Sequence, residues 1–269
     1  MLEALDLTPK LSRKEYRARL RTARAELRDL QYQLGDHHIP GIVVLEGWAA
    51  CGKGECLAKL VDALDPRWMR VHPIPPPLEH ERLRPFLWRF WIKTPARGMV
   101  ALFDHSWYGR VLGDRVDARV KKEEWDRAYQ EINHFERWLA DDGAAIVKLW
   151  YHITCKEQRR RMRRLEADPT TAWKVTRDDW REHRRYDDYV LAVEEMLEGT
   201  STAEAPWTPV PAMDRRWSRI RTLEAVIEAL RRAVEARSGG PSSLSSPSNP
   251  SSPGEGTAGA PGPAIEATR

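Results

Sequence analysis

Gly47-Trp48-Ala49-Ala50-Cys51-Gly52-Lys53-Gly54 is the stretch that decides the fold of this chain. An apolar segment typical of a buried strand, residues 41–45, precedes it, and a segment with helical character, residues 55–64, follows it. Its spacing, G-x-x-x-x-G-K, matches a phosphate-binding P-loop, with Gly54 where Ser or Thr is usual. At such a helix start, backbone N–H groups and the helix dipole favour an anion, and Lys53 adds a cation. A plain tight turn is the alternative, but the flanking segments and the lysine favour a phosphate site.

The segments around this loop alternate between strand and helix. Strands are expected at residues 41–45, 68–74, 99–103, 144–153 and 207–212. Helices are expected at residues 12–34, 55–64, 84–93, 122–139, 154–165, 178–197 and 217–236, the fifth opening with a Thr154–Glu157 capping box. The alternation predicts an α/β fold with a parallel sheet and helices on both of its faces.

The length of 269 residues suffices for one sizeable α/β domain with an appended element. We expect an N-terminal helical extension over residues 1–40 and a P-loop domain over residues 41–237, with a lid at about residues 155–185. Residues 238–269 are mostly Ser, Pro, Gly and Ala, and they offer too little apolar surface to offset the entropy of ordering. They are therefore predicted to be a disordered tail.

Charge and cysteine content narrow the possible environments. The formal net charge of +4 favours an anionic partner without selecting nucleic acid, membrane or phosphate. Cys51, Cys56 and Cys155 are odd in number and form no CxxC pair, so neither a disulfide framework nor a zinc site is indicated. The N-terminal region has no long apolar run, so we expect no secretory signal and no membrane span. A reducing cytoplasm fits these features.

Asp104 ends the strand expected at residues 99–103 and opens the motif Asp104-His105-Ser106-Trp107-Tyr108-Gly109-Arg110. In P-loop phosphotransferases an acidic residue at the end of a neighbouring strand holds Mg²⁺, which neutralises the transferred phosphoryl group. Asp104 is placed for that role; the alternative is a strand-end Asp that caps the next turn. His105 is interpreted as a polar neighbour, since phosphoryl transfer needs positioning and charge more than a strong base.

Basic side chains crowd the two helical segments that follow residue 154. They are Lys156, Arg159, Arg160, Arg161, Arg163, Arg164, Lys174, Arg177, Arg181, Arg184 and Arg185. Local acidic residues cannot pair all of them, so an anion between the helices would relieve their repulsion. One interpretation is a basic face exposed to solvent. The more specific hypothesis is a lid that closes on phosphates, binds their oxygens through guanidinium groups and excludes water.

The chain holds 12 tryptophans, and most of them are expected to serve packing. Trp88, Trp91, Trp138 and Trp150 lie on otherwise apolar segments and are predicted to be core residues. Trp48 in the loop and Trp173 between the basic helices are instead candidates to face a nucleobase or another ligand.

Short motifs recur along residues 10–236 in a fixed order. They are Glu46-Gly47-Trp48, Gly52-Lys53-Gly54, Leu87-Trp88-Arg89-Phe90-Trp91, Pro95-Ala96-Arg97-Gly98, Phe103 to Leu112, Lys148 to Ile153, Glu157-Gln158, Trp173-Lys174, Asp187-Asp188-Tyr189, Thr200-Ser201-Thr202, Ala205-Pro206-Trp207, Asp214-Arg215 and Arg219. Together they resemble the polyphosphate kinase 2 family, and more narrowly its polyphosphate:AMP phosphotransferase branch, in which glycine at position 54 is usual.

The resemblance implies a P-loop kinase-like, three-layer α/β/α sandwich with a helical lid. It also implies Mg²⁺-dependent phosphoryl transfer between inorganic polyphosphate and a nucleotide, AMP/ADP or GMP/GDP, and a homo-oligomer, either a dimer or a tetramer. Three positions depart from the family pattern. Ala49 replaces an Asp that helps to hold the metal or orient the acceptor, and His105 and Leu165 each replace an Arg. Since Gly54 lacks a hydroxyl, Asp104 is the only oxygen ligand for Mg²⁺ that the motifs supply.

The sequence therefore predicts a cytoplasmic, polyphosphate-dependent nucleotide phosphotransferase. Lys53, Asp104 and Arg110 are its predicted catalytic residues, Asp104 its metal ligand, and the loop from Gly47 to Gly54 with Arg161 and Lys174 its phosphate-binding residues. One alternative is a catalytically weakened or inactive family member that binds polyphosphate or nucleotide, which Ala49 supports. Another is a small-molecule kinase that uses ATP. Nucleic-acid binding is not favoured, because no known binding module is visible.

Overall fold

Five parallel strands form the centre of the part of the chain that the structure, a computed structural model, describes, residues 2–238. They are β1 (Gly41–Gly47), β2 (Met69–Pro73), β3 (Val100–Asp104), β4 (Ala145–His152) and β5 (Trp207–Pro211), in the order β2-β3-β1-β4-β5. All four neighbouring pairs run parallel. The five strands predicted from the sequence are confirmed.

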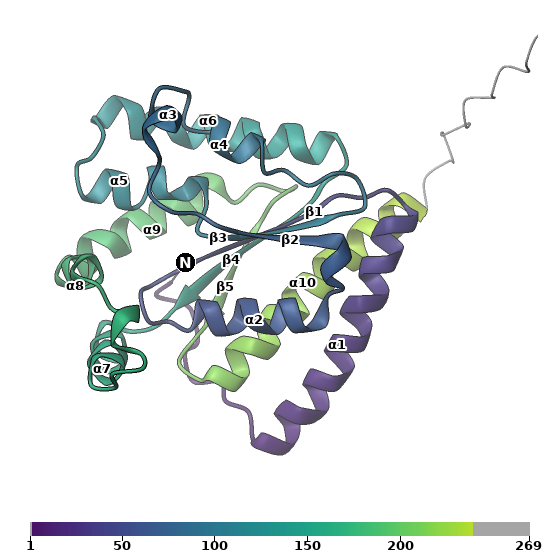
Figure 1. The fold of residues 1–269 in the computed structure, drawn as a ribbon, viewed down its shortest axis with the longest axis horizontal. Helices are drawn as coiled ribbons and strands as arrows, with labels where there is room; N and C mark the ends of the chain where they lie inside the picture. Colours follow the sequence, from purple (N-terminus) through teal and green to yellow (C-terminus); the bar gives the residue numbers. More distant parts are fainter. Residues whose placement is uncertain (1, 239–269) are drawn as a thin grey trace, which may run out of the picture. The chain divides into compact units, whose positions relative to one another are not determined.

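Helices cover both faces of this sheet (Figure 1). On one face lie α2 (Lys53–Ala63) and α10 (Arg215–Ser238), with α1 (Arg13–Asp36) packed along α10. On the other lie α6 (Lys122–Asp141) and α9 (Tyr186–Thr200). The remaining elements are η1 (Pro66–Trp68), α3 (Glu79–Arg82), α4 (Trp88–Trp91), η2 (Trp107–Arg110), α5 (Gly113–Val116), α7 (Cys155–Glu166), η3 (Ala172–Lys174) and α8 (Arg177–Arg184). The predicted three-layer α/β/α sandwich is confirmed.

The central strand of the sheet, β1, is almost entirely apolar and buried. Ile42, Val43, Val44 and Leu45 of β1 are at most 1% exposed, because helices cover the sheet on both sides. The pairing places Leu45 of β1 opposite Asp104 of β3, so the carboxyl ends of these strands share one edge of the sheet. The P-loop and the strand-end aspartate therefore meet there.

Lys148 joins the layers from within β4, where every residue is buried. Its ammonium lies 2.7 Å from Oε2 of Glu136 in α6, 2.8 Å from the Tyr108 hydroxyl in η2 and 2.6 Å from the Thr200 carbonyl oxygen in α9. The Lys148 and Glu136 side chains are 0% and 1% exposed. Such a fully buried ion pair is tolerated only when hydrogen bonds satisfy its remaining atoms, as they do here.

Three predictions about local structure are wrong. The helix expected at residues 178–197 is two helices, α8 and α9, because Arg185 leaves helical geometry and its guanidinium binds the Val116 carbonyl oxygen and Asp188. Trp91 and Trp138 are 40% and 60% exposed, although Trp150 is buried as predicted. Thr154 caps α7 through the N–H of Glu157, but the Glu157 carboxylate binds arginines instead of closing a capping box.

Two further expectations concern the ends of the chain and membranes. The predicted tail lies outside the described residues, apart from Ser238, which ends α10. Within residues 2–238, no helix combines the length and the apolar character that crossing a bilayer requires.

Candidate functional site

The loop between β1 and α2 is shaped for close contact with an anion. A Cβ atom on Gly47 would lie 2.7 Å from both Cβ and the carbonyl oxygen of Tyr151 in β4, so only glycine fits beside that strand. Ala50 and Gly52 take left-handed conformations, with φ of 58° and 100°. Within residues 2–238, the N–H groups of Ala50, Gly52 and Gly54 donate to no protein acceptor. Unpaired N–H groups of this kind at a helix N-terminus form an anion-binding concavity.

Lys53, the first residue of α2, reaches across to the end of β3. Its Nζ lies 3.1 Å from Oδ1 of Asp104 and 2.8 Å from Nε2 of His105. An ammonium group can only donate, so Nε2 of His105 accepts and the ring proton is assigned to Nδ1. The structure thus brings together the lysine and the aspartate that the sequence placed in one site.

Glu46, at the end of β1, supports this arrangement from below. Its carboxylate lies 3.3 Å from Nδ1 of His105 and accepts a hydrogen bond of 2.7 Å from Ser106. Burial alone would raise the pKa of Glu46, but His105, Lys53 and Ser106 together hold it below its usual value. A charged Glu46 fixes the histidine, and the histidine in turn orients Lys53. Sequence reasoning treated His105 only as a neighbour and gave Glu46 no role of its own.

Asp104 has the chemistry that a magnesium ligand needs. Its Oδ1 is buried and accepts no hydrogen bond in the part of the chain that the structure describes, although the Lys53 ammonium lies close by. Within residues 2–238, no cluster of three or more His, Cys, Asp or Glu side chains could hold a metal ion. Mg²⁺ is commonly held by one or two carboxylates together with substrate phosphates and water. The residues present therefore fit a Mg²⁺ ion that arrives with a phosphate.

The segment predicted to be a lid comprises α7, η3 and α8; it is called the lid below, and it carries an unbalanced positive charge. Seven of its basic side chains are exposed and form no ion pair with any residue between 2 and 238: Lys156, Arg159, Arg163, Arg164, Lys174, Arg177 and Arg184. Lys174 lies over the ring of its neighbour Trp173, which is 74% exposed. These free cations keep both predicted hypotheses open, a solvated face and a surface for polyanions.

Arg161 is the exception among the lid arginines. It is 5% exposed, and its five N–H groups are directed to Glu157 and to the carbonyl oxygens of Cys51, Ala50, Ala212 and Met213. No N–H group remains for a phosphate oxygen in this arrangement. The direct phosphate contact predicted for Arg161 is therefore corrected to support of the P-loop backbone from beneath.

Arg110 and Trp48 take contrasting positions. Arg110 lies 3.6 Å from Asp114 and 4.9 Å above the Phe86 ring, and within residues 2–238 it forms no hydrogen bond or ion pair with the P-loop or with Asp104. Trp48 is 2% exposed, stacks on Tyr186 with ring centroids 4.3 Å apart and donates to His152. It belongs to the core and does not face a ligand, which corrects its candidacy for base stacking.

Glu182 of α8 is a residue that the sequence gave no reason to single out. Its side chain is half-buried, and its carboxylate lies near the backbone N–H of Ala49 and the side chains of Lys53 and His105. Burial, with repulsion from Asp179, raises the pKa of Glu182 to about 7. No local pattern in the sequence links positions 49 and 182.

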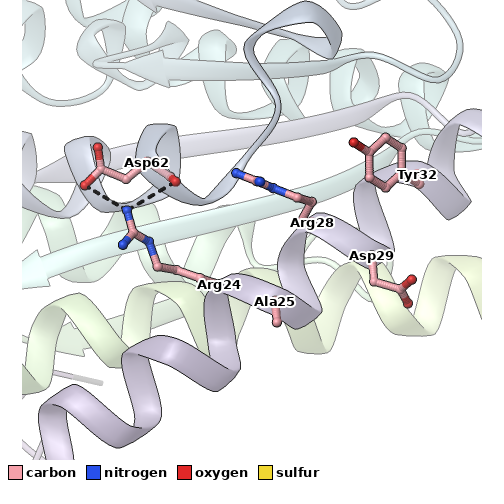
Figure 2. Close-up of a pocket in the computed structure, with 6 residues that line it drawn as sticks. All are labelled: Arg24, Ala25, Arg28, Asp29, Tyr32 and Asp62. Carbon is pink, nitrogen blue, oxygen red and sulfur yellow. Dashed lines mark hydrogen bonds and ion pairs between the residues drawn. The ribbon is translucent and has the colours of Figure 1, made fainter.

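A surface pocket lies elsewhere, between α1 and α2 (Figure 2). Its volume is about 690 Å³, and it is lined by Arg24, Ala25, Arg28, Asp29, Tyr32 and Asp62. Arg24 pairs with Asp62 at 3.4 Å, and Arg28 donates to the Ala63 carbonyl oxygen. Its charged groups are engaged with the protein, and none of the lining residues belongs to the P-loop.

Comparisons with known proteins agree with this geometry. The sequence model of the family described as Polyphosphate kinase 2 (PPK2) matches residues 10–238. A polyphosphate:AMP phosphotransferase from Pseudomonas syringae pv. tomato is 41% identical over 237 residues, 87% of this chain and 47% of the relative. An AMP/ADP-polyphosphate phosphotransferase from Meiothermus ruber is 36% identical and covers 72% of each chain. The crystal structure of polyphosphate kinase 2 from Arthrobacter aurescens TC1 has a TM-score of 0.82, with 33% identity over 86% of this chain and 85% of that one.

Proposed function

Because the chain belongs to the polyphosphate kinase 2 family, we propose that it transfers phosphoryl groups between inorganic polyphosphate and a nucleoside mono- or diphosphate. The chain spans about half the length of the Pseudomonas syringae relative, and the relative from Meiothermus ruber is named for AMP and ADP. AMP and ADP are therefore the first acceptors to test, with GMP and GDP beside them.

One observation carries the proposal: the Lys53 ammonium lies 3.1 Å from Asp104, at the mouth of a loop with three N–H groups that donate to no acceptor among residues 2–238. These N–H groups and Lys53 bind the transferring phosphoryl group and stabilise the charge that develops on its oxygens. His105 and Glu46 hold Lys53 in place. We propose that Arg110, which lies beside Asp114, adds positive charge to the site when substrate is bound.

Mg²⁺, when bound, neutralises charge on the phosphate oxygens, and Asp104 is the residue that would hold it. Oδ1 of Asp104 supports this assignment, because it is buried and accepts no hydrogen bond from any residue between 2 and 238, although the Lys53 ammonium lies 3.1 Å away. The polyphosphate chain lies along the unpaired cations of α7, η3 and α8, Lys174 among them. A closed lid keeps water from the phosphoryl group and so suppresses hydrolysis.

The family resemblance and the composition of the chain also suggest where the protein acts and with which partners. We expect a homo-oligomer, a dimer or tetramer, in the cytoplasm, with neither nucleic acid nor membrane as a partner. The rival hypothesis of an inactive, binding-only protein rests on Ala49, and the same assay decides it.

The direct test supplies purified protein with polyphosphate, Mg²⁺ and AMP, ADP, GMP or GDP in parallel, and separates the nucleotides by anion-exchange chromatography. We expect a new nucleotide carrying one more phosphate, and weaker polyphosphate binding as ionic strength rises from about 0.05 M to about 0.3 M. Absence of any new nucleotide at every enzyme level would contradict catalysis and leave the binding-only hypothesis.

Lys53→Met is the matching substitution. It removes the charge that stabilises the transferring group, so kcat/KM should fall by about a hundredfold or more. Lys59→Met is the control on the same helix, because Lys59 lies 2.6 Å from Asp62 and outside the loop. Activity of Lys53→Met equal to that of the control would remove Lys53 from the mechanism.

A further inference from the structure

One flank of α1 carries a row of positive charges that no group within residues 2–238 pairs. Arg13, Arg17 and Arg21 follow one another at intervals of four residues, and Lys14 lies three residues before Arg17. Residues three or four apart are neighbours on a helix surface, so these side chains form one row. All four are exposed, and none of them forms an ion pair or a side-chain hydrogen bond in the described part of the chain. Together with the exposed Lys10 just before the helix, they are the basic stripe.

The basic stripe does not hold α1 in place. The helix is attached to α10 by another of its faces, where Arg19 pairs with Glu224 at 2.5 Å. Further along, Arg24 turns toward α2 and pairs with Asp62 at 3.4 Å (Figure 2). Like charges four residues apart destabilise a helix, so the basic stripe lowers the stability of α1 unless an anion lies against it.

Two contacts connect the basic stripe to the helix that follows the P-loop. Arg216, at the start of α10, donates a hydrogen bond of 2.8 Å to the carbonyl oxygen of Leu11, just before the first turn of α1. Figure 1 shows the starts of α1 and α10 beside each other. Arg215, the neighbour of Arg216, lies 3.0 Å from Glu55, the residue after the last glycine of the P-loop. The basic stripe is therefore linked to the proposed phosphate site through the start of α10.

The lid meets the same part of the molecule. Arg161 of α7 donates a hydrogen bond of 2.8 Å to the carbonyl oxygen of Met213, two residues before Arg215. Arg215 and Arg216 are themselves exposed. Positively charged side chains thus continue from the lid, over the start of α10, to the basic stripe.

We propose that the basic stripe binds the part of a long polyphosphate chain that extends beyond the lid, with Arg215 and Arg216 between the two. The inference rests on the proposed function and deepens it, because it makes a long polymer the preferred form of that substrate. A linear polyanion matches a row of cations that have no partner among residues 2–238, and each contact releases counterions. Polyphosphate is favoured over nucleic acid because the row leads to a phosphoryl-transfer site.

The test compares phosphate chains of two lengths in calorimetric titrations without nucleotide. Arg13→Gln/Arg17→Gln removes two charges of the basic stripe. At about 0.1 M salt, its Kd for long-chain polyphosphate should rise about fivefold or more, and its Kd for tripolyphosphate should stay within about twofold of wild type. Binding of the long chain should also depend less steeply on salt, because fewer counterions are released.

Arg232→Gln/Arg237→Gln is the matched control. Both arginines are exposed, have no ion-pair partner among residues 2–238 and lie at the opposite end of α10 from Arg216. Their replacement removes the same charge from the protein and should leave both Kd values within about twofold of wild type.

Four results would overturn the inference. They are an unchanged Kd for long-chain polyphosphate in Arg13→Gln/Arg17→Gln, an equal rise in the control variant, an equal loss of tripolyphosphate affinity, and a wild type that binds double-stranded DNA more tightly than long-chain polyphosphate. A wild type that binds neither phosphate chain would overturn the proposed function as well. The expected effect of chain length in a protein that forms no new nucleotide would support the basic stripe and count against the proposed reaction alone.

Discussion

Gly47 shows how one missing side chain decides the course of the loop. Any Cβ there would lie 2.7 Å from Tyr151 of the neighbouring strand, and backbone at that distance cannot give way cheaply. Gly47→Ala should therefore displace the loop, lower the free energy of unfolding by about 1–3 kcal/mol and weaken tripolyphosphate binding by about tenfold. Calorimetric titration and urea unfolding measure the two effects.

Gly35→Ala is the control for that substitution. Nothing lies within 4 Å of a Cβ at Gly35, which belongs to α1, so the change should be neutral or stabilise by up to about 1 kcal/mol. Unaltered tripolyphosphate affinity in Gly47→Ala would show that the loop tolerates displacement, contrary to the account of its shape.

Glu182 makes stability depend on pH in a predictable direction. Because burial raises its folded pKa from 4.5 to about 7, its contribution to stability is fully present below pH 4.5 and is lost as the pH rises through about 7. Glu182→Gln stays neutral, so without metal or phosphate it should gain stability over wild type as the pH rises from about 5.5 to about 8.5. The full pKa difference corresponds to at most about 3 kcal/mol, and opening of the lid reduces it.

Urea unfolding of both proteins at the two pH values measures this difference, with Asp178→Asn as the exposed control. A constant difference between Glu182→Gln and wild type across the range would mean that Glu182 ionises normally.

Among individual residues, the positions of those that belong to a local sequence motif could be predicted. The positions of those that depend on tertiary contacts could not. Lys53 and Asp104 each follow a strand in the sequence, and parallel strands end at one edge, so their meeting was foreseeable. His105 and Glu182 depend on contacts between distant segments, which spacing does not reveal.

At the scale of elements, α7 supports the P-loop through Arg161. That guanidinium connects α7 to the loop and to the chain between β5 and α10 by its five N–H groups. Arg161→Met would leave buried carbonyl oxygens unpaired, so we expect a loss of about 2–4 kcal/mol in unfolding free energy together with weaker tripolyphosphate binding.

Arg160→Met is the control that distinguishes a supporting role of Arg161 from direct contact between Arg161 and phosphate. Arg160 shares Glu157 with Arg161 but is 66% exposed, and its removal should cost at most about 1 kcal/mol. Lost tripolyphosphate affinity in Arg161→Met with unchanged stability would instead return Arg161 to the phosphate-binding residues.

The lid also shows where helix prediction fails. Residues 178–197 have a continuous helical pattern, yet the chain breaks at Arg185, whose side chain is drawn to Val116 and Asp188. α8 stays outside the core, whereas α9 buries Tyr189, Val193 and Leu197. Local propensity favours one helix, and contacts with α5 decide for two.

At the scale of the whole molecule, the layers could be predicted because strands and helices alternate along the chain. The strand order could not, since periodicity does not say which strands pair. The exposure of two tryptophan side chains was also not predicted. Trp91 and Trp138 lie together at the surface, with ring centroids 6.1 Å apart, although their segments are as apolar as a protein core. Apolar composition does not settle burial, since much of any protein surface is apolar.

Substitution of Lys148 tests which interactions hold the helices on the sheet. It is a charged residue at the centre of β4, and its ammonium joins α6, η2 and α9 to the sheet. Lys148→Met leaves Glu136 as an unpaired buried carboxylate, so the free energy of unfolding should fall by about 3–5 kcal/mol. Adding Glu136→Gln removes that charge and keeps an acceptor for Trp107 and Tyr108, so the double variant should recover part of the loss. Urea unfolding of the wild type, both single variants and the double variant closes the cycle. A Lys148→Met protein as stable as wild type would mean that apolar packing alone holds α6 and α9 on the sheet.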